Sequence, residues 1–180
     1  MAEPRCGVSD IQEIVDLNYI PWTNENISYA IEKTFSLDMP ISEVRQVIRE
    51  SLDLWSKYIP RNFIEIDNFD AADIKISSQN NFDKNEVANA NTKGTLVFDK
   101  KLKWKRYKIG ETEFPDTLDI LAVTVHEIGH ILGLKHLSIQ ETNMKPNFYH
   151  FFDLNNVYIQ PFIFAADIQS IQSIYGEKKN

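Results

Sequence analysis

The sequence predicts an α+β fold in which helices pack on a mixed β-sheet. Three observations predict it: strand-like segments gather in the first half of the chain, a long amphipathic helix follows the first of them, and two further helical segments lie toward the C-terminus. The chain has 180 residues, of which 43% are hydrophobic, and this is enough for one domain with a sizeable core. The order of the strands stays open.

The first half contains most of the expected strands. Residues 1–25 are expected to form an irregular leader, and residues 27–34 a strand. A helix is expected over 42–58, because apolar residues recur there at helical spacing and Pro60 follows as a stop. Shorter strands are expected after it, at 62–66, 72–76, 86–91 and 95–98.

The second half begins with another helix. Asp116 or Thr117 is expected to cap a helix that runs over 118–134. Residues 135–161 form a long irregular stretch, and its length indicates a functional role. A last helix is expected over 165–175, followed by a glycine as its stop.

Charge and composition exclude several classes of protein. The chain has 19 basic and 26 acidic residues and a net charge of −7, which argues against nucleic acid as the main partner. The basic stretch from Lys100 to Lys108 runs against this trend and is interpreted as a solvated surface loop. No apolar run approaches the roughly 20 residues of a membrane span, so none is expected in this chain. Cys6 is the single cysteine, which excludes an internal disulfide framework.

The N-terminal residues do not resemble a signal peptide. The segment MAEPRCGVSD has no positively charged start and no apolar core. The sequence leaves two alternatives open, a cytosolic protein or a fragment of a longer precursor. A glycosylation sequon at Asn26 is only weak evidence for secretion.

The segment HEIGH, residues 126–130, is the main candidate site. His126 and His130 are four residues apart and would share one face of a helix, so both imidazoles could bind one metal ion. Glu127 would be close enough to reach a water molecule on that ion without being a ligand. The pentapeptide alone would also be compatible with two solvated histidines on a surface helix.

The residues that follow make the pattern more specific. Gly133 permits a sharp turn after the helix, and His136 comes three residues later. Three histidines and a water molecule are the typical arrangement of catalytic zinc. The remaining alternative is mainly a decayed enzyme that has kept the motif.

The extended motif resembles that of the metzincins, and other segments resemble the matrix metalloproteinases, or matrixins. Met144 follows His136 by eight residues and fits the Met-turn of the clan. The leader segment PRCGVSD, residues 4–10, resembles the matrixin cysteine switch PRCGxPD, with Ser9 in place of proline. The last helix also resembles the closing segment of the family.

The resemblance covers nearly the whole chain and implies the metzincin/matrixin fold: a twisted five-stranded mixed sheet, three helices and a zinc-site cleft. It implies that residues 1–15 are the C-terminal remnant of a propeptide, in which Cys6 binds zinc in the latent form. Residues 16–180 would be the catalytic domain. The site residues would be the zinc ligands His126, His130 and His136, the catalytic Glu127 and the Met-turn residue Met144.

The chain departs from the family at its other metal sites. Asn89 and Val97 stand where loop histidines are expected, and His150 is the only histidine outside the motif. A structural zinc is therefore not expected, which leaves one catalytic Zn²⁺. Lys100 and Lys101 replace acidic calcium ligands, so the calcium site is expected to be lost as well.

These observations predict a secreted, extracellular zinc-dependent endopeptidase. It would hydrolyse peptide bonds of extracellular or matrix proteins through metal-activated water, with Glu127 as the general base. The alternative is a catalytically weak zinc-binding relative that acts as a binding module or decoy, and a cytosolic metallopeptidase is a third interpretation. We expect a monomer whose partners are protein or peptide substrates and protein inhibitors of the tissue-inhibitor type.

The resemblance also implies a set of substrate-binding residues. An edge strand formed by Val87, Ala88, Asn89 and Ala90 would accept the substrate as an added strand. Ala122 would form the floor of the pocket for the residue after the scissile bond, and its outer wall would consist of Pro146, Asn147 and Phe148. A small floor residue predicts a deep pocket. The alternative is that Phe148 or residues 151–161 fill it.

Overall fold

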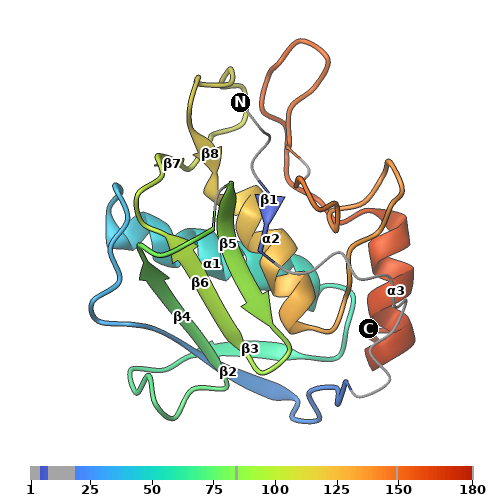
Figure 1. Cartoon of the computed structure of the whole chain (residues 1–180). Helices are drawn as coiled ribbons and strands as arrows, with labels where there is room; N and C mark the ends of the chain where they lie inside the picture. The colour runs from blue at the N-terminus through green and yellow to red at the C-terminus, as the bar shows by residue number, and fades with distance from the viewer. Residues whose placement is uncertain (1–4, 8–18, 84, 149, 180) are drawn as a thin grey trace.

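The computed structural model describes residues 5–7, 19–83, 85–148 and 150–179. They confirm an α+β fold with one mixed sheet, in the strand order β1-β5-β6-β4-β2-β3 (Figure 1). The strands of this sheet are β1 (Arg5–Cys6), β2 (Asn26–Ile31), β3 (Asn62–Glu65), β4 (Ile74–Gln79), β5 (Glu86–Asn91) and β6 (Thr95–Asp99). A two-stranded sheet consists of β7 (Trp104–Lys105) and β8 (Leu118–Asp119), and the helices are α1 (Ile41–Ser56), α2 (Ile120–Ile131) and α3 (Ala165–Tyr175).

Strands β2 to β6 are the five strands that the family resemblance implies. All neighbouring pairs in this sheet are parallel except β5 and β6, which pair antiparallel. The sixth strand, β1, was not expected, because the leader was predicted to be irregular. It pairs in parallel with β5 at the edge of the sheet. The expectations for residues 1–4 and 8–18 of the leader lie outside the described residues.

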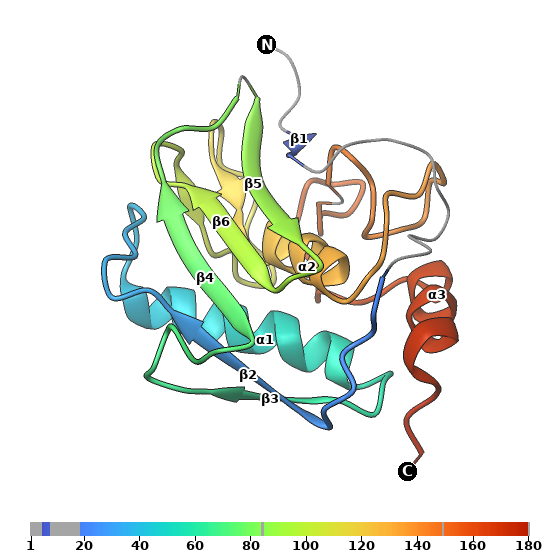
Figure 2. The same cartoon turned by 60° about the horizontal axis from the view of Figure 1, so that its bottom comes forward.

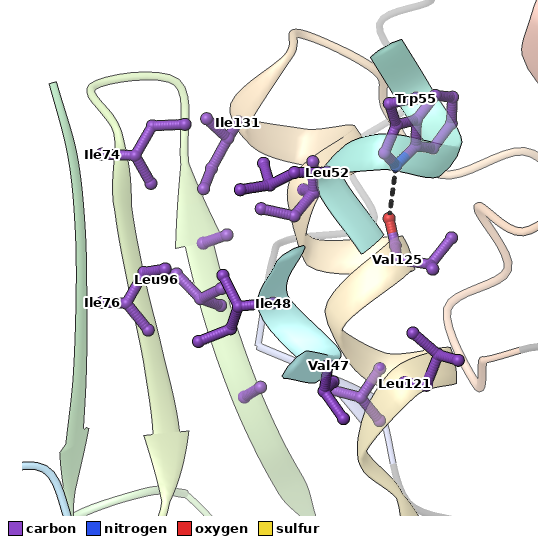
Figure 3. Close-up of a cluster of buried hydrophobic side chains, with 14 of the residues drawn as sticks. Val47, Ile48, Leu52, Trp55, Ile74, Ile76, Leu96, Leu121, Val125 and Ile131 are labelled. Atoms are coloured by element: carbon purple, nitrogen blue, oxygen red, sulfur yellow. Dashed lines mark hydrogen bonds between the residues drawn. The ribbon is translucent and has the colours of Figure 1, made fainter. Parts of the chain in front are cut away.

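Helices α1 and α2 cover the same face of the sheet, and the main core lies between these layers (Figures 1 and 3). The apolar stripe of α1 is buried as its helical spacing predicts, and Figure 3 shows Ile48 and Leu52 pointing toward the sheet. Trp55, near the end of α1, is completely buried, and its indole nitrogen donates a 3.0 Å hydrogen bond to the carbonyl of Val125 on α2. This bond ties the helix of the candidate site to the core.

Most expected elements exist, with boundaries that differ by a few residues. The strand expected at 27–34 ends at Ile31, and the strand expected at 72–76 is shifted to Ile74–Gln79. The last helix has the expected bounds, and Gly176 follows it at φ +77°. Figure 2 shows that α3 lies beside the sheet and α1 rather than on the sheet face.

The bounds of α2 differ from the expected ones, both at the residue that caps its start and at the residue where it ends. Its cap is Asp119, whose Oδ1 accepts a 3.0 Å hydrogen bond from the amide of Leu121, and the helix ends at Ile131. Asp116 has φ +60°, which does not suit the extended backbone of a cap. Residues 118 and 119 instead form β8, which pairs with β7.

The basic stretch from Lys100 to Lys108 is not simply a solvated loop. Trp104 and Tyr107 are buried, and Trp104 lies in β7. Within the described residues, none of the helices has the length and apolar character needed to cross a membrane.

Candidate metal centre

Helix α2 places two histidines of the motif in the interior. His126 and His130 are buried, and their Nε2 atoms lie 3.0 Å apart. His136 reaches the same point from the segment after the helix, with its Nε2 3.2 Å from that of His130 and 3.3 Å from that of His126. A tetrahedral zinc ion with Zn–N distances of about 2.0–2.1 Å separates its nitrogen ligands by about 3.3 Å. The three nitrogens therefore fit such an ion.

Backbone carbonyls orient two of the imidazoles. Nδ1 of His126 lies 2.8 Å from the carbonyl oxygen of Asn143, and Nδ1 of His130 lies 2.8 Å from that of Leu134. A carbonyl can only accept, so Nδ1 carries the proton in both rings and each Nε2 keeps a free lone pair. Burial, followed by the neighbouring imidazoles, holds the pKa of His126 well below its usual range and lowers that of His130 to about 3. Both rings are thus neutral, as metal ligands must be.

A glycine turn brings the third histidine into place. Gly133 has φ +96°, a conformation that favours glycine, and the amide of Leu134 donates to the carbonyl of Gly129 at 2.9 Å. This hydrogen bond closes the end of the helix, and the turn at Gly133 directs the chain toward His136. The turn predicted from the sequence is therefore present.

Met144 lies directly against the helix that carries the motif. It is completely buried, and a Cβ atom built on Gly129 would fall 2.4 Å from its sulfur. The turn around it is held by Asp167 of α3, whose carboxylate accepts hydrogen bonds from the hydroxyl of Thr142 and from the amide of Asn143. Met144 indicates this turn in the sequence. Nothing in the sequence indicates that the carbonyl of Asn143 orients His126.

The leader brings Cys6 to the same point. Cys6 is fully buried and pairs with Ala88 in the sheet register, while its amide donates to the carbonyl of Pro146 at 3.0 Å. Its sulfur and one nitrogen from each of the three histidines all lie within 4.8 Å of one another. One thiolate and three imidazoles form a donor set that zinc accepts well.

Glu127 is completely buried next to this group. Burial raises the pKa of its carboxyl to about 8, and the nearby Cys6 side chain lowers it only in part. A carboxyl with a pKa near neutrality can both take up and release a proton at physiological pH.

The expected edge strand lies beside the metal centre. In β5, Val87, Ala88 and Ala90 are buried, and Asn89 is half-buried with its Nδ2 2.7 Å from the position that a Cβ on Gly7 would occupy. Strand β1 covers the outer edge of β5 in the structure. This edge therefore accepts an extended chain through main-chain hydrogen bonds.

The expected pocket wall also lies near the histidines. The buried ring of Phe148 packs edge-on against the imidazole of His126, with 4.8 Å between the ring centroids. Pro146 and Asn147 form the turn before it, and the carbonyl of Pro146 bonds to Cys6. The leader therefore lies between this segment and β5.

Ala122 is buried on the first half of α2, where aromatic residues pack against it. Its neighbours in this cluster include Tyr107, Phe151 and Tyr158, of which Phe151 is completely buried. The space beside Ala122 is thus lined by the long segment after the Met-turn. The depth of the pocket for the residue after the scissile bond stays a prediction.

Sequence reasoning missed Tyr19. Its ring lies against Gly133, and its hydroxyl is hydrogen-bonded to that of Tyr175 in α3. Three residues later, the indole of Trp22 donates to the carbonyl of Ile131 at 3.0 Å. In the sequence, only the two aromatic residues at the end of the leader could have suggested that this segment packs against the end of α2.

Comparison with known proteins agrees with this geometry. A sequence model of the matrixin family matches residues 21–176. Matrix metalloproteinase-C of Caenorhabditis elegans is 32% identical over 189 residues, which cover 98% of this chain and 32% of that protein. Interstitial collagenase of Equus caballus is 31% identical (100% of this chain, 38% of that protein), and matrix metalloproteinase-26 of Homo sapiens is 30% identical (98% and 68%). The chain therefore spans only about a third of the length of the first two relatives.

Proposed function

Because this chain belongs to the matrixin family, we propose that it is a zinc-dependent endopeptidase that is held latent by its own leader. The observation that supports this most directly is the convergence of the Nε2 atoms of His126, His130 and His136, with the buried Glu127 beside them. No feature of a pure binding module would require a buried carboxyl at this position.

The three histidines would hold one zinc ion, which when bound supplies a water molecule with a pKa near 7 and polarises the scissile carbonyl. Glu127 would accept a proton on its carboxylate and then deliver it to the amine of the leaving peptide. Burial raises the pKa of this carboxyl above its usual range, which favours the return of the proton to the leaving amine. A general base of this kind typically contributes about 10²–10⁴-fold to the rate.

The substrate would bind as an extended strand along the edge of β5. The pairing of the leader with Ala88 supports this, because it shows that the edge is open to main-chain hydrogen bonds. Ala122 would line the pocket for the residue after the scissile bond, with Pro146, Asn147 and Phe148 as its wall. The substrates would be proteins outside the cell. The chain would act there as a monomer, and protein inhibitors of the tissue-inhibitor type would bind it.

Residues 1–15 would be the end of a propeptide and residues 16–180 the catalytic domain. The sulfur of Cys6 would occupy the fourth position around the metal and so exclude the water molecule that hydrolysis requires. The leader would also block the edge of β5. Removal of the leader would open both sites at once.

The experiment that tests this function is cleavage of a quenched peptide, with and without a chelator, alongside zinc analysis. The wild-type chain should be nearly inactive, and Cys6→Ser should hydrolyse the peptide in a chelator-sensitive way. Adding Glu127→Ala to Cys6→Ser should keep the zinc and lose at least about a hundredfold in rate. A double variant that kept more than a tenth of the activity would contradict the role of Glu127. Full zinc loading without any hydrolysis, both in Cys6→Ser and in a chain that lacks residues 1–15, would favour the binding-module alternative, because the shortened chain leaves the edge of β5 open.

A further inference from the structure

The positive charge of this acidic protein is concentrated in one short segment. Residues 100–108 contain six of the 19 basic residues and no acidic residue, so the rest of the chain has 13 basic against 26 acidic residues. We call these six residues the basic stripe: Lys100, Lys101, Lys103, Lys105, Arg106 and Lys108. Neither the metal centre nor the proposed hydrolysis uses them.

Two buried aromatic residues hold the basic stripe in a defined conformation. Trp104 packs edge-on against Phe98, with 5.4 Å between the ring centroids, and its indole donates to the carbonyl of Asp99 at 2.8 Å. Tyr107 is buried, and its hydroxyl lies 2.7 Å from that of Thr117. The pairing of β7 with β8 adds a third restraint. The lysines are therefore presented on an ordered backbone, which lowers the entropy cost of binding a ligand.

Four of the six cations form no salt bridge within the part of the chain that the structure describes. Lys105 pairs with Glu111 and Arg106 with Glu50, each at 3.1 Å. The other four, Lys100, Lys101, Lys103 and Lys108, are exposed and form no ion pair with any residue that the structure describes. Four lysines without a salt bridge on an otherwise acidic protein suit an anionic partner that contacts this segment alone.

We propose that the basic stripe binds a linear sulfated polysaccharide. Lys100 and Lys101 lie in a turn and Lys105 in β7, so the lysines follow one another along a short surface segment. The repeated sulfate groups of a linear polymer can contact several of them at once. A flat anionic bilayer fits less well, because the next loop is acidic at Glu111 and Glu113 and hydrogen-bonds to the exposed turn that carries Asp153. A thin polymer avoids these carboxylates. Such binding would hold the protein on a sulfated matrix, and it does not depend on hydrolysis.

Direct binding of the intact chain to heparin tests the proposal. The test variant replaces Lys100, Lys101, Lys103 and Lys108 by glutamine. The matched control replaces four exposed lysines elsewhere by glutamine, Lys33, Lys57, Lys93 and Lys179, and so has the same net charge. We expect the test variant to bind heparin at least tenfold more weakly and with a shallower salt dependence, because fewer counterions are released. The control should stay within about threefold of wild type.

Three results would overturn the proposal. The first is an equal loss in both quadruple variants, which would indicate only a general charge effect. The second is undiminished binding to desulfated heparin. The third is tighter binding to phosphatidylserine vesicles or to duplex DNA than to heparin. Thermal melting checks that the variants are folded. If the quadruple variant melts early, the double variant Lys101→Gln with Lys103→Gln replaces it. The heparin affinity of the double variant should fall by about threefold or more.

Discussion

The ring of Tyr19 occupies the space that a side chain at residue 133 would need. A Cβ atom built on Gly133 would fall 2.3 Å from Cε1 of Tyr19. Gly133 is the residue at which the chain leaves α2 and turns toward His136. Tyr19, near the end of the leader, therefore packs against the turn that positions the third histidine.

Replacing Gly133 with alanine separates this contact from backbone strain. Gly110 has a similar φ, +90° against +96°, but nothing lies within 4 Å of its Cβ position. We expect Gly110→Ala to cost about 1–2 kcal/mol for the left-handed backbone, and Gly133→Ala to cost about 1–3 kcal/mol more for the clash with Tyr19. Denaturant unfolding measures both. Equal losses in the two variants would show that Tyr19 does not brace the turn.

Asp167 should affect metal binding although it is not a ligand. It accepts a 2.6 Å hydrogen bond from the amide of Asn143, and the carbonyl of Asn143 orients His126. We expect Asp167→Ala to weaken zinc binding by about 10–100-fold, the usual effect of losing an outer partner of a ligand. A competition assay with a chelating dye measures this. The exposed Gln169→Ala on the same helix is the control, and an unchanged zinc affinity in Asp167→Ala would contradict the coupling.

Asp119 should make the protein less stable as the pH rises through the acidic range. Burial raises the pKa of its carboxyl to about 6, above its usual value of 3.8, so the folded chain binds this proton more tightly than the unfolded chain. The protonated carboxyl of Asp119 therefore makes its full contribution to the free energy of unfolding below about pH 4. This contribution falls as the pH rises to about 6, and the free energy of unfolding is then lower by an amount on the order of 1–3 kcal/mol.

Asp119→Asn should remove this dependence, because asparagine keeps the helix cap without the charge. Unfolding at pH 4, 5, 6 and 7 measures the effect, and the exposed Asp38→Asn controls for the loss of one charge. A fall in stability that is as steep in Asp119→Asn as in wild type would rule out Asp119 as its source.

The purified chain should contain one zinc ion and need no calcium. Among the described residues, Cys6 and the three histidines are the only group of three or more histidine, cysteine or carboxylate side chains placed to hold a metal. Asp73, a possible calcium ligand, instead accepts hydrogen bonds from the amide and hydroxyl of Ser28 at 2.8 and 2.6 Å. Elemental analysis and melting with added calcium test this. Two tightly bound zinc ions, or a large calcium-dependent rise in Tm, would contradict it.

The residue after the scissile bond should be large and apolar. Each methylene buried in an apolar pocket contributes about 0.8 kcal/mol, so leucine or methionine should be preferred over alanine by tenfold or more. Phe151 packs in one cluster with Ala122, so Phe151→Ala should shift the preference further toward large residues. Ala122→Arg should abolish it.

A peptide library varied at this one position measures the selectivity of the Cys6→Ser enzyme. Phe114→Ala, which removes an exposed ring, is the control. A wild-type preference for small residues, or no change in Phe151→Ala, would show that this pocket is formed elsewhere.

Local patterns were sufficient for the helices and for the motif. The last helix has the predicted bounds because its apolar residues recur at helical spacing and Gly176 suits the positive φ that follows it. The three histidines could be identified together for the same reason, since a helix and one turn fix their relative positions within eleven residues. The expected cap, Asp116 or Thr117, was wrong, because Asp119 has the same capping chemistry and its place at the end of β8, which pairs with β7, depends on a contact that is not local.

By itself, the sequence therefore determined the fold class, the three histidines of the candidate metal site and the glycine turn that joins them, all of which depend on residues close together in the chain. Only the tertiary structure decided which distant segments complete the site. The pairing of Cys6 with Ala88, the contact of Tyr19 with Gly133 and the packing of Phe151 with Ala122 each join residues far apart in sequence. Such contacts depend on the order of the strands and on the shape of the packed core, and no local periodicity encodes either.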